Sequence, residues 1–233
     1  MIQKTISVGK IFVTDSDFGH VGVGQADFPE RFSKQFGFIP SPVVWMDQVH
    51  GRSIQWVQGM REHASLFPKT DGLMTQQRDV MLITKTADCV PILLWNDEKK
   101  IIAALHCGWR GFLADIIPAF AERCKERGFD PGEFSAFLGP HLRASSFEVK
   151  EDFLRLISPK HAHLVIKRDG KSFFDITSGV QEQLGGFGVS SIEDCGIDTF
   201  SDEDYFSFRR WTQSADSVRP KTYNTFANCI IIR

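Results

Sequence analysis

The chain has 233 residues, of which 42% are hydrophobic and 24% are charged, and its formal net charge at pH 7 is −2. This composition predicts a globular protein with a sizeable core, and we expect a single domain that spans residues 1–233. The near-neutral charge gives no reason to expect a nucleic-acid partner. No apolar run is long enough to cross a bilayer, and the opening MIQKTISVGK lacks the apolar segment of a signal peptide. We therefore expect a cytoplasmic protein with no membrane partner.

Short apolar runs recur along the chain and predict β-strands, whereas helical patterns are fewer. The runs in the middle of the chain do not alternate with polar residues, which is typical of strands buried on both faces. Asp115 and Asp175 are candidate helix caps, and Pro118 is expected to kink or restart the helix that contains it. These patterns predict an α+β fold with a mixed sheet covered by helices. The predicted strands are residues 43–50, 53–58, 80–84, 90–95, 101–106, 134–139, 205–210 and 226–232, and the predicted helices are residues 112–127, 150–157 and 175–184.

Three of the predicted strands end in a potential metal ligand beside a glycine, a proline or an acid. Zinc binds imidazole nitrogen and thiolate sulfur, and a catalytic zinc keeps three protein ligands and an open fourth position. Asp47 and Asp88 are candidates to orient an imidazole or a substrate. The strand ends are DQVHG (47–51), TADCVP (86–91) and LHCGWRG (105–111), and the candidate ligands are His50, Cys89 and His106, or Cys107 in place of one of them.

The same atoms also fit a catalytic site without a metal. In a cysteine hydrolase, Cys89 would be the nucleophile and His50 or His106 its base. The sequence does not separate the two hypotheses, because both need a thiolate beside an imidazole.

Several cationic side chains are candidates to bind an anion near these strand ends. Arg110 lies between Trp109 and Gly111, and a guanidinium group binds phosphate through two parallel hydrogen bonds. The polar segment 201–224 is expected to form a flap over the site, from which Arg209 and Arg210 emerge. Further candidates are Lys85, His141 and Arg143.

Five motifs taken together resemble the YfiH-like family, over the chain from about Pro42 to the C-terminus. That family carries two labels, multicopper polyphenol oxidoreductase (laccase domain) and purine nucleoside phosphorylase with adenosine deaminase activity. The motifs are DQVHG (47–51), TADCVPILL (86–94), ALHCGWRG (104–111), LGPHLRASSFEV (138–149) and YFSFRR (205–210).

The resemblance implies an α/β/α sandwich with mixed sheets and a metal held by His50, Cys89 and His106. It also implies that Cys107 fills space rather than binding the metal. The activity it implies is that of a transferase and hydrolase, which cleaves purine nucleosides with phosphate and deaminates adenosine. The partners are then a small nucleoside and phosphate, and the cofactor is Zn²⁺.

Copper chemistry of the laccase type remains an alternative function. A multicopper oxidase needs many histidines in paired motifs, and this chain has seven histidines in all. We therefore expect zinc rather than copper. A site that keeps zinc only as a structural ion is a further alternative, which the number of protein ligands on the metal distinguishes from catalysis.

Overall fold

The computed structural model describes residues 1–40, 42–60, 64–189, 191–215 and 223–233. Two six-stranded sheets form the centre of the molecule, and each mixes parallel and antiparallel pairs. The first sheet has the order β1 (Ile2–Ile6), β2 (Gly9–Val13), β15 (Phe226–Ile232), β7 (Met81–Thr86), β3 (Val43–Met46) and β5 (Ala64–Phe67). The second has the order β14 (Ser191–Asp194), β10 (Phe134–Leu138), β8 (Val90–Asn96), β9 (Ile101–Cys107), β6 (Gly72–Thr75) and β4 (Ile54–Trp56).

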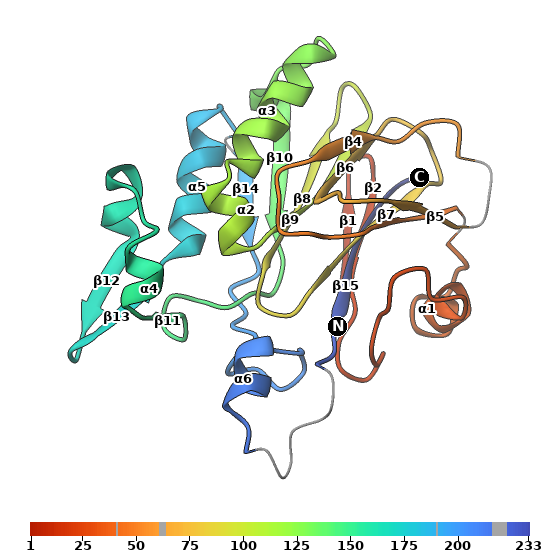
Figure 1. Cartoon of the computed structure of the whole chain (residues 1–233). Helices are drawn as coiled ribbons and strands as arrows, with labels where there is room; N and C mark the ends of the chain where they lie inside the picture. Colours follow the sequence, from red (N-terminus) through yellow and green to blue (C-terminus); the bar gives the residue numbers. More distant parts are fainter. Residues whose placement is uncertain (41, 61–63, 190, 216–222) are drawn as a thin grey trace.

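Helices cover the outer faces of the two sheets (Figure 1). Helix α1 (Phe28–Phe36) packs on the first sheet through a core that includes Phe12 and Trp45. The second sheet packs on the other side against α2 (Trp109–Leu113), α3 (Ile116–Glu126) and α5 (Ile176–Gly186). A third sheet with the order β11 (Glu148–Val149), β13 (Lys171–Phe174) and β12 (Val165–Arg168) lies beside these helices (Figure 1). The remaining elements are α4 (Glu151–Leu154), α6 (Phe208–Gln213) and the 3-10 helices Pro131–Glu133 and Pro159–Leu164.

A third hydrophobic core lies between the two large sheets and holds them face to face. Val44 and Leu82 of the first sheet belong to the same buried cluster as Leu93 and Ala104 of the second. All seven residues of β8 and of β9 are buried, as their unalternating apolar sequences predict. The predicted α+β class with mixed sheets and outer helices is confirmed, and its middle layer consists of two stacked sheets.

The strand predicted at 43–50 ends at Met46, and the helix predicted at 150–157 covers only Glu151–Leu154. Two other predicted elements differ in kind or in the place where they break. Residues 205–210 are not a strand, because Ser207 accepts a hydrogen bond from the Arg210 N–H at 3.1 Å and so starts helix α6 at Phe208. The long predicted helix breaks at Ala114–Asp115 rather than at Pro118. Asp115 has a left-handed backbone, whereas Pro118 lies in the first turn of α3, where its missing N–H costs no helical hydrogen bond.

Of the two predicted helix caps, Asp175 and Asp115, only the first caps its helix in the structure. The Asp175 side chain caps α5 by accepting the Ser178 N–H at 3.0 Å, which confirms its predicted role. Asp115 precedes α3 but pairs with Lys160 instead of capping. Among the described residues, no helix combines the length and the apolar character needed to span a membrane.

Candidate metal centre

The candidate site lies where the chain crosses between the two stacked sheets. Strands β3, β5 and β7 run parallel, so their carboxyl ends lie at the same edge of the first sheet. Each is followed by a crossing to the second sheet, and these three crossings carry His50, Asp71 and Cys89. His106 belongs to β9 and is paired with Pro91, at the start of the strand that follows Cys89. The topology thus brings residues far apart in sequence to one place.

His50, Cys89 and His106 form one group with the geometry of a metal site. Their potential ligand atoms all lie within 4.8 Å of one another. The rings of His50 and His106 are 4.7 Å apart, centroid to centroid, and nearly perpendicular. Two imidazoles and a thiolate suit a borderline-soft ion such as zinc, and they are poor ligands for magnesium or calcium.

Asp71, which was not among the predicted site residues, organises this group. Its carboxylate is fully buried, accepts the N–H groups of His50 at 2.9 Å and Gly51 at 2.7 Å, and lies 2.8 Å from His106 Nδ1. His106 then donates through Nδ1 and keeps Nε2 for a metal, as in many zinc sites. The sequence signal that could have indicated Asp71 is an acid followed by glycine before an apolar stretch, in KTDGLMT (69–75).

The electrostatics of the site favour a thiolate. Burial raises the pKa of the Cys89 thiol, but the charge of His106 and hydrogen bonds from His106 and His50 outweigh burial and lower it to about 6. Burial lowers the pKa of His106, but Cys89 and Asp71 outweigh burial and raise it to about 9. The neighbouring Cys107 is fully buried and its pKa is raised by burial, which agrees with a space-filling role.

Gly108 leaves the room that the ligands need. A Cβ atom at this position would lie 2.8 Å from Cys89 Sγ and 2.9 Å from His50 Cδ2, closer than real Cβ contacts allow. Its backbone is extended, with φ at −74°, so the requirement for glycine is one of space rather than of conformation.

The three candidate ligands line a cavity of about 410 Å³, which we call the inner cavity. Arg110, Arg209 and Lys85, which are predicted to bind an anion, line it too. The Arg110 guanidinium lies 4.2 Å from the centre of the Trp109 ring. Arg209 donates to the Glu148 carbonyl at 3.0 Å, which fixes its side chain at the wall.

Two other predicted anion ligands lie elsewhere. The Arg210 guanidinium donates to the carbonyl oxygens of Thr199, Phe200, Asp202 and Tyr205, so it closes the turn before α6. His141 is fully buried, with Nδ1 2.7 Å from the Gly139 carbonyl oxygen and Nε2 2.8 Å from Thr177 Oγ1. Neither residue lines the inner cavity.

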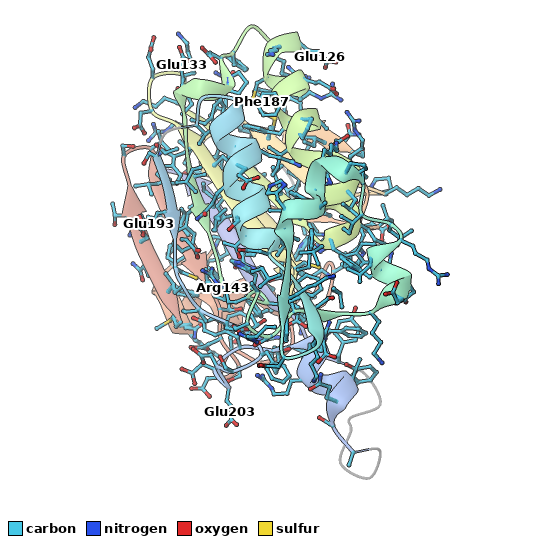
Figure 2. All side chains as sticks on the ribbon, turned by 90° about the vertical axis from the view of Figure 1, so that its left-hand side faces the viewer. Glu126, Glu133, Arg143, Phe187, Glu193 and Glu203 are labelled. Carbon is cyan, nitrogen blue, oxygen red and sulfur yellow. The ribbon has the colours of Figure 1, made fainter. Side chains whose placement is uncertain are left out.

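Arg143 is also committed to internal contacts, since its guanidinium forms an ion pair with Asp194 at 2.7 Å. It lies below α5 in Figure 2, well away from Glu126 and Glu133 at the upper end of the molecule.

Helix α6, which supplies Arg209, lies at the lower end, near Glu203. Part of the predicted flap, residues 216–222, lies outside the described residues.

The two acids expected beside the ligands have other partners. Asp88 accepts hydrogen bonds from Thr199 Oγ1 at 2.7 Å and from the Arg209 N–H at 2.6 Å, so it ties α6 to the crossing that carries Cys89. Asp47 is exposed and accepts the Lys69 N–H at 3.4 Å. The carboxylate that contacts an imidazole of the site is that of Asp71.

The fold and the site define a two-sheet sandwich with a His–Cys–His centre at its crossings. Residues 26–218 match the model of the family described as multi-copper polyphenol oxidoreductase laccase. The match covers most of the chain, and the protein belongs to this family.

Relatives and a solved structure agree with this assignment. Purine nucleoside phosphorylase ORF3 of Streptomyces griseus is 30% identical over 208 residues, which are 85% of each chain. A purine nucleoside phosphorylase of Streptomyces coelicolor is 32% identical over 182 residues, 78% of this chain and 75% of that protein. The crystal structure of the hypothetical protein YfiH of Bacillus licheniformis has a TM-score of 0.75 at 19% identity, and it covers 92% of this chain and 85% of that one. The resemblance to YfiH-like proteins is confirmed.

Proposed function

We propose that this protein is a zinc-dependent purine nucleoside phosphorylase that also deaminates adenosine. The proposal rests on one observation: three ligands suited to zinc line a cavity of about 410 Å³ that also presents Arg110 and Arg209. The two Streptomyces relatives, both named purine nucleoside phosphorylases, supply the class of substrate.

His50, Cys89 and His106 would hold the zinc, with Asp71 fixing the tautomer of His106. Bound zinc supplies a Lewis acid and an activated water near neutral pH. Three protein ligands would leave a coordination position open. All three line the inner cavity, which supports a substrate site beside the metal.

The chain's own residues would bind and orient the substrates. Arg110 and Arg209 would hold phosphate so that one of its oxygens attacks C1′ of the sugar while the bond from C1′ to the purine breaks. Phe147 and Phe208 line the same cavity, and their rings would limit the access of water to the reacting carbon.

Product analysis tests this function. Zinc-loaded protein and adenosine should give adenine and ribose 1-phosphate only when phosphate is present, and inosine with or without phosphate. Both products should fall in His50→Ala and His106→Ala, because each removes a candidate ligand. Liquid chromatography separates the products. Adenosine, inosine and guanosine left unchanged after a long incubation would refute the proposal.

The low pKa of Cys89 supports one alternative, a cysteine hydrolase that acts on a small amide without metal. Iodoacetamide separates the two functions. Zinc ligation predicts that bound zinc protects Cys89 from alkylation and that the activity disappears with a strong chelator. A hydrolase predicts activity that survives the chelator and is lost on alkylation.

The family description raises a second alternative, a copper oxidase. Among the described residues, the His, Cys, Asp and Glu side chains form one potential metal group, that of His50, Cys89 and His106. A four-copper centre needs more ligands than this group offers. Uptake of dioxygen with a phenol, appearing only after copper loading, would support the oxidase.

A further inference from the structure

A second and larger cavity adjoins the inner cavity. Its volume is about 630 Å³, and we call it the outer cavity. Both volumes fall in the range of small-molecule sites. Arg110 and Arg209 line both cavities, as do Trp109 and Phe147, so these residues form a shared wall. A ligand that fills the inner cavity and extends into the outer one therefore meets these shared residues.

The outer cavity is rich in cationic groups. Arg110, Lys150 and Arg209 line it, against the carboxylates of Glu148 and Asp152. Glu148 is paired with Lys171 at 2.9 Å and is also close enough to Arg209 and Lys150 for their charges to help lower its pKa. Glu148 and Asp152 are thus the opposing charges among the described lining residues, and Lys171 balances that of Glu148.

These cations are available to a ligand. Arg110 and Lys150 are both exposed. The Arg110 guanidinium lies over the Trp109 ring, and the charge of Lys150 acts on Glu148, but in the described parts of the chain neither cation makes a salt bridge within 4.0 Å. Arg209 is instead oriented by its bond to the Glu148 carbonyl, which holds the guanidinium at the shared wall. Arginine and lysine side chains arranged in this way typically bind phosphate oxygens.

We propose that the outer cavity binds the phosphate of a nucleoside 5′-phosphate, so that purine nucleotides are ligands of this protein when Arg110 and Arg209 do not hold inorganic phosphate. The inference rests on the proposed function, because it takes the inner cavity as the nucleoside site. Lys150 lines the outer cavity but not the inner one. Replacing Lys150 therefore tests binding of the 5′-phosphate separately from binding of the nucleoside.

Inorganic phosphate has the same oxyanion chemistry, and the test must separate the two sources. Inosine and inosine 5′-monophosphate in phosphate-free buffer serve this purpose, because neither is deaminated and phosphorolysis has no co-substrate. Isothermal titration calorimetry on zinc-loaded protein compares their affinities, and a third titration adds inorganic phosphate to the complex with inosine.

Three variants probe the charge of the outer cavity. Lys150→Ala should weaken binding of the nucleotide about tenfold and leave that of inosine unchanged. Asp152→Asn should strengthen nucleotide binding, because it removes an opposing charge that no salt bridge balances in the described residues. Lys167→Ala is the matched control, since Lys167 is exposed in β12, carries the same charge and lines neither cavity.

The expected result is that wild-type protein binds the nucleotide about tenfold more tightly than inosine, and that this preference is lost in Lys150→Ala only. Equal affinity for inosine and its 5′-phosphate would overturn the inference while leaving the proposed function intact. A Lys150→Ala variant that weakens inorganic phosphate but not the nucleotide would overturn it as well. If neither compound binds, the proposed function fails and the inference fails with it.

Discussion

Asp71 Oδ1 lies 2.8 Å from His106 Nδ1 and also accepts the backbone N–H of His50 at 2.9 Å. One buried carboxylate thus fixes the ring of one candidate ligand and the main chain of another. His50 has a left-handed backbone, with φ at 59°, and the bonds from His50 and Gly51 to Asp71 hold the crossing in that conformation. Asp71 thus joins two of the candidate ligands through its hydrogen bonds.

Replacing Asp71 should therefore weaken metal binding. In Asp71→Asn the amide keeps the size of the carboxylate but turns a donor toward groups that themselves donate, and we expect zinc affinity to fall about 10- to 100-fold. Asp47→Asn is the control, since Asp47 is exposed and contacts neither imidazole. Competition with a chromophoric chelator measures the affinity. Equal affinity in wild type and Asp71→Asn would show that Asp71 serves the fold alone.

Gly108→Ala should empty the site without unfolding the protein. The new methyl group would meet Cys89 Sγ at 2.8 Å and His50 Cδ2 at 2.9 Å, so the two ligands must separate. Gly185→Ala is the matched control, because a Cβ at Gly185 in α5 meets nothing within 4 Å. Zinc content and thermal melting report the two effects. Full zinc occupancy in Gly108→Ala would contradict the geometry of the centre.

Arg110→Ala should reduce phosphorolysis far more than deamination. The side chain is exposed and stacks on Trp109, so its loss should change the free energy of unfolding by less than about 1 kcal/mol. Arg110→Lys should recover only part of the activity, because an ammonium group lacks the paired donors of a guanidinium. Initial rates at varied phosphate concentration give the KM for phosphate. A collapsed melting temperature with normal phosphorolysis in the remaining folded protein would make Arg110 structural.

His141 should affect the pH dependence of stability rather than substrate binding. Burial lowers its pKa to about 4, and the nearby charge of Arg143 adds to this. The folded value lies below the unfolded value of 6.5, so the stabilising contribution is complete above pH 6.5 and is lost as the pH falls toward 4. The free energy of unfolding of His141→Gln should fall less steeply over this interval. Parallel curves for wild type and variant, measured by denaturant titration, would exclude this role.

The sequence allowed the ligand set to be predicted better than its surroundings. His50, Cys89 and His106 stand out because ligand-type side chains follow apolar strands, and the family motifs contain the same residues. Asp71 was missed because nothing in its local sequence indicates that β5 and β6 belong to different sheets. Its contact with His106 depends on the parallel alignment of β3, β5 and β7, which is a tertiary property.

The different positions of Arg209 and Arg210 also depend on tertiary contacts that the local sequence does not indicate. Arg209 and Arg210 are adjacent in sequence, and the strand expected at 205–210 would point them to opposite faces. Helix α6 instead directs Arg209 to the inner cavity and Arg210 to the carbonyls of the preceding turn. The decisive interaction is the bond from the Arg209 N–H to Asp88, a residue 121 positions away, which no local pattern reveals.

Zinc content is the most direct test of the central claim that these crossings build a metal centre. Elemental analysis of protein purified without added metal should give about one zinc per chain in wild type and in the control Cys107→Ala, and far less in Cys89→Ser. Cys107 is the matched control, because it is adjacent to His106 and fully buried but does not belong to the ligand group. Equal zinc in wild type and Cys89→Ser would contradict the account.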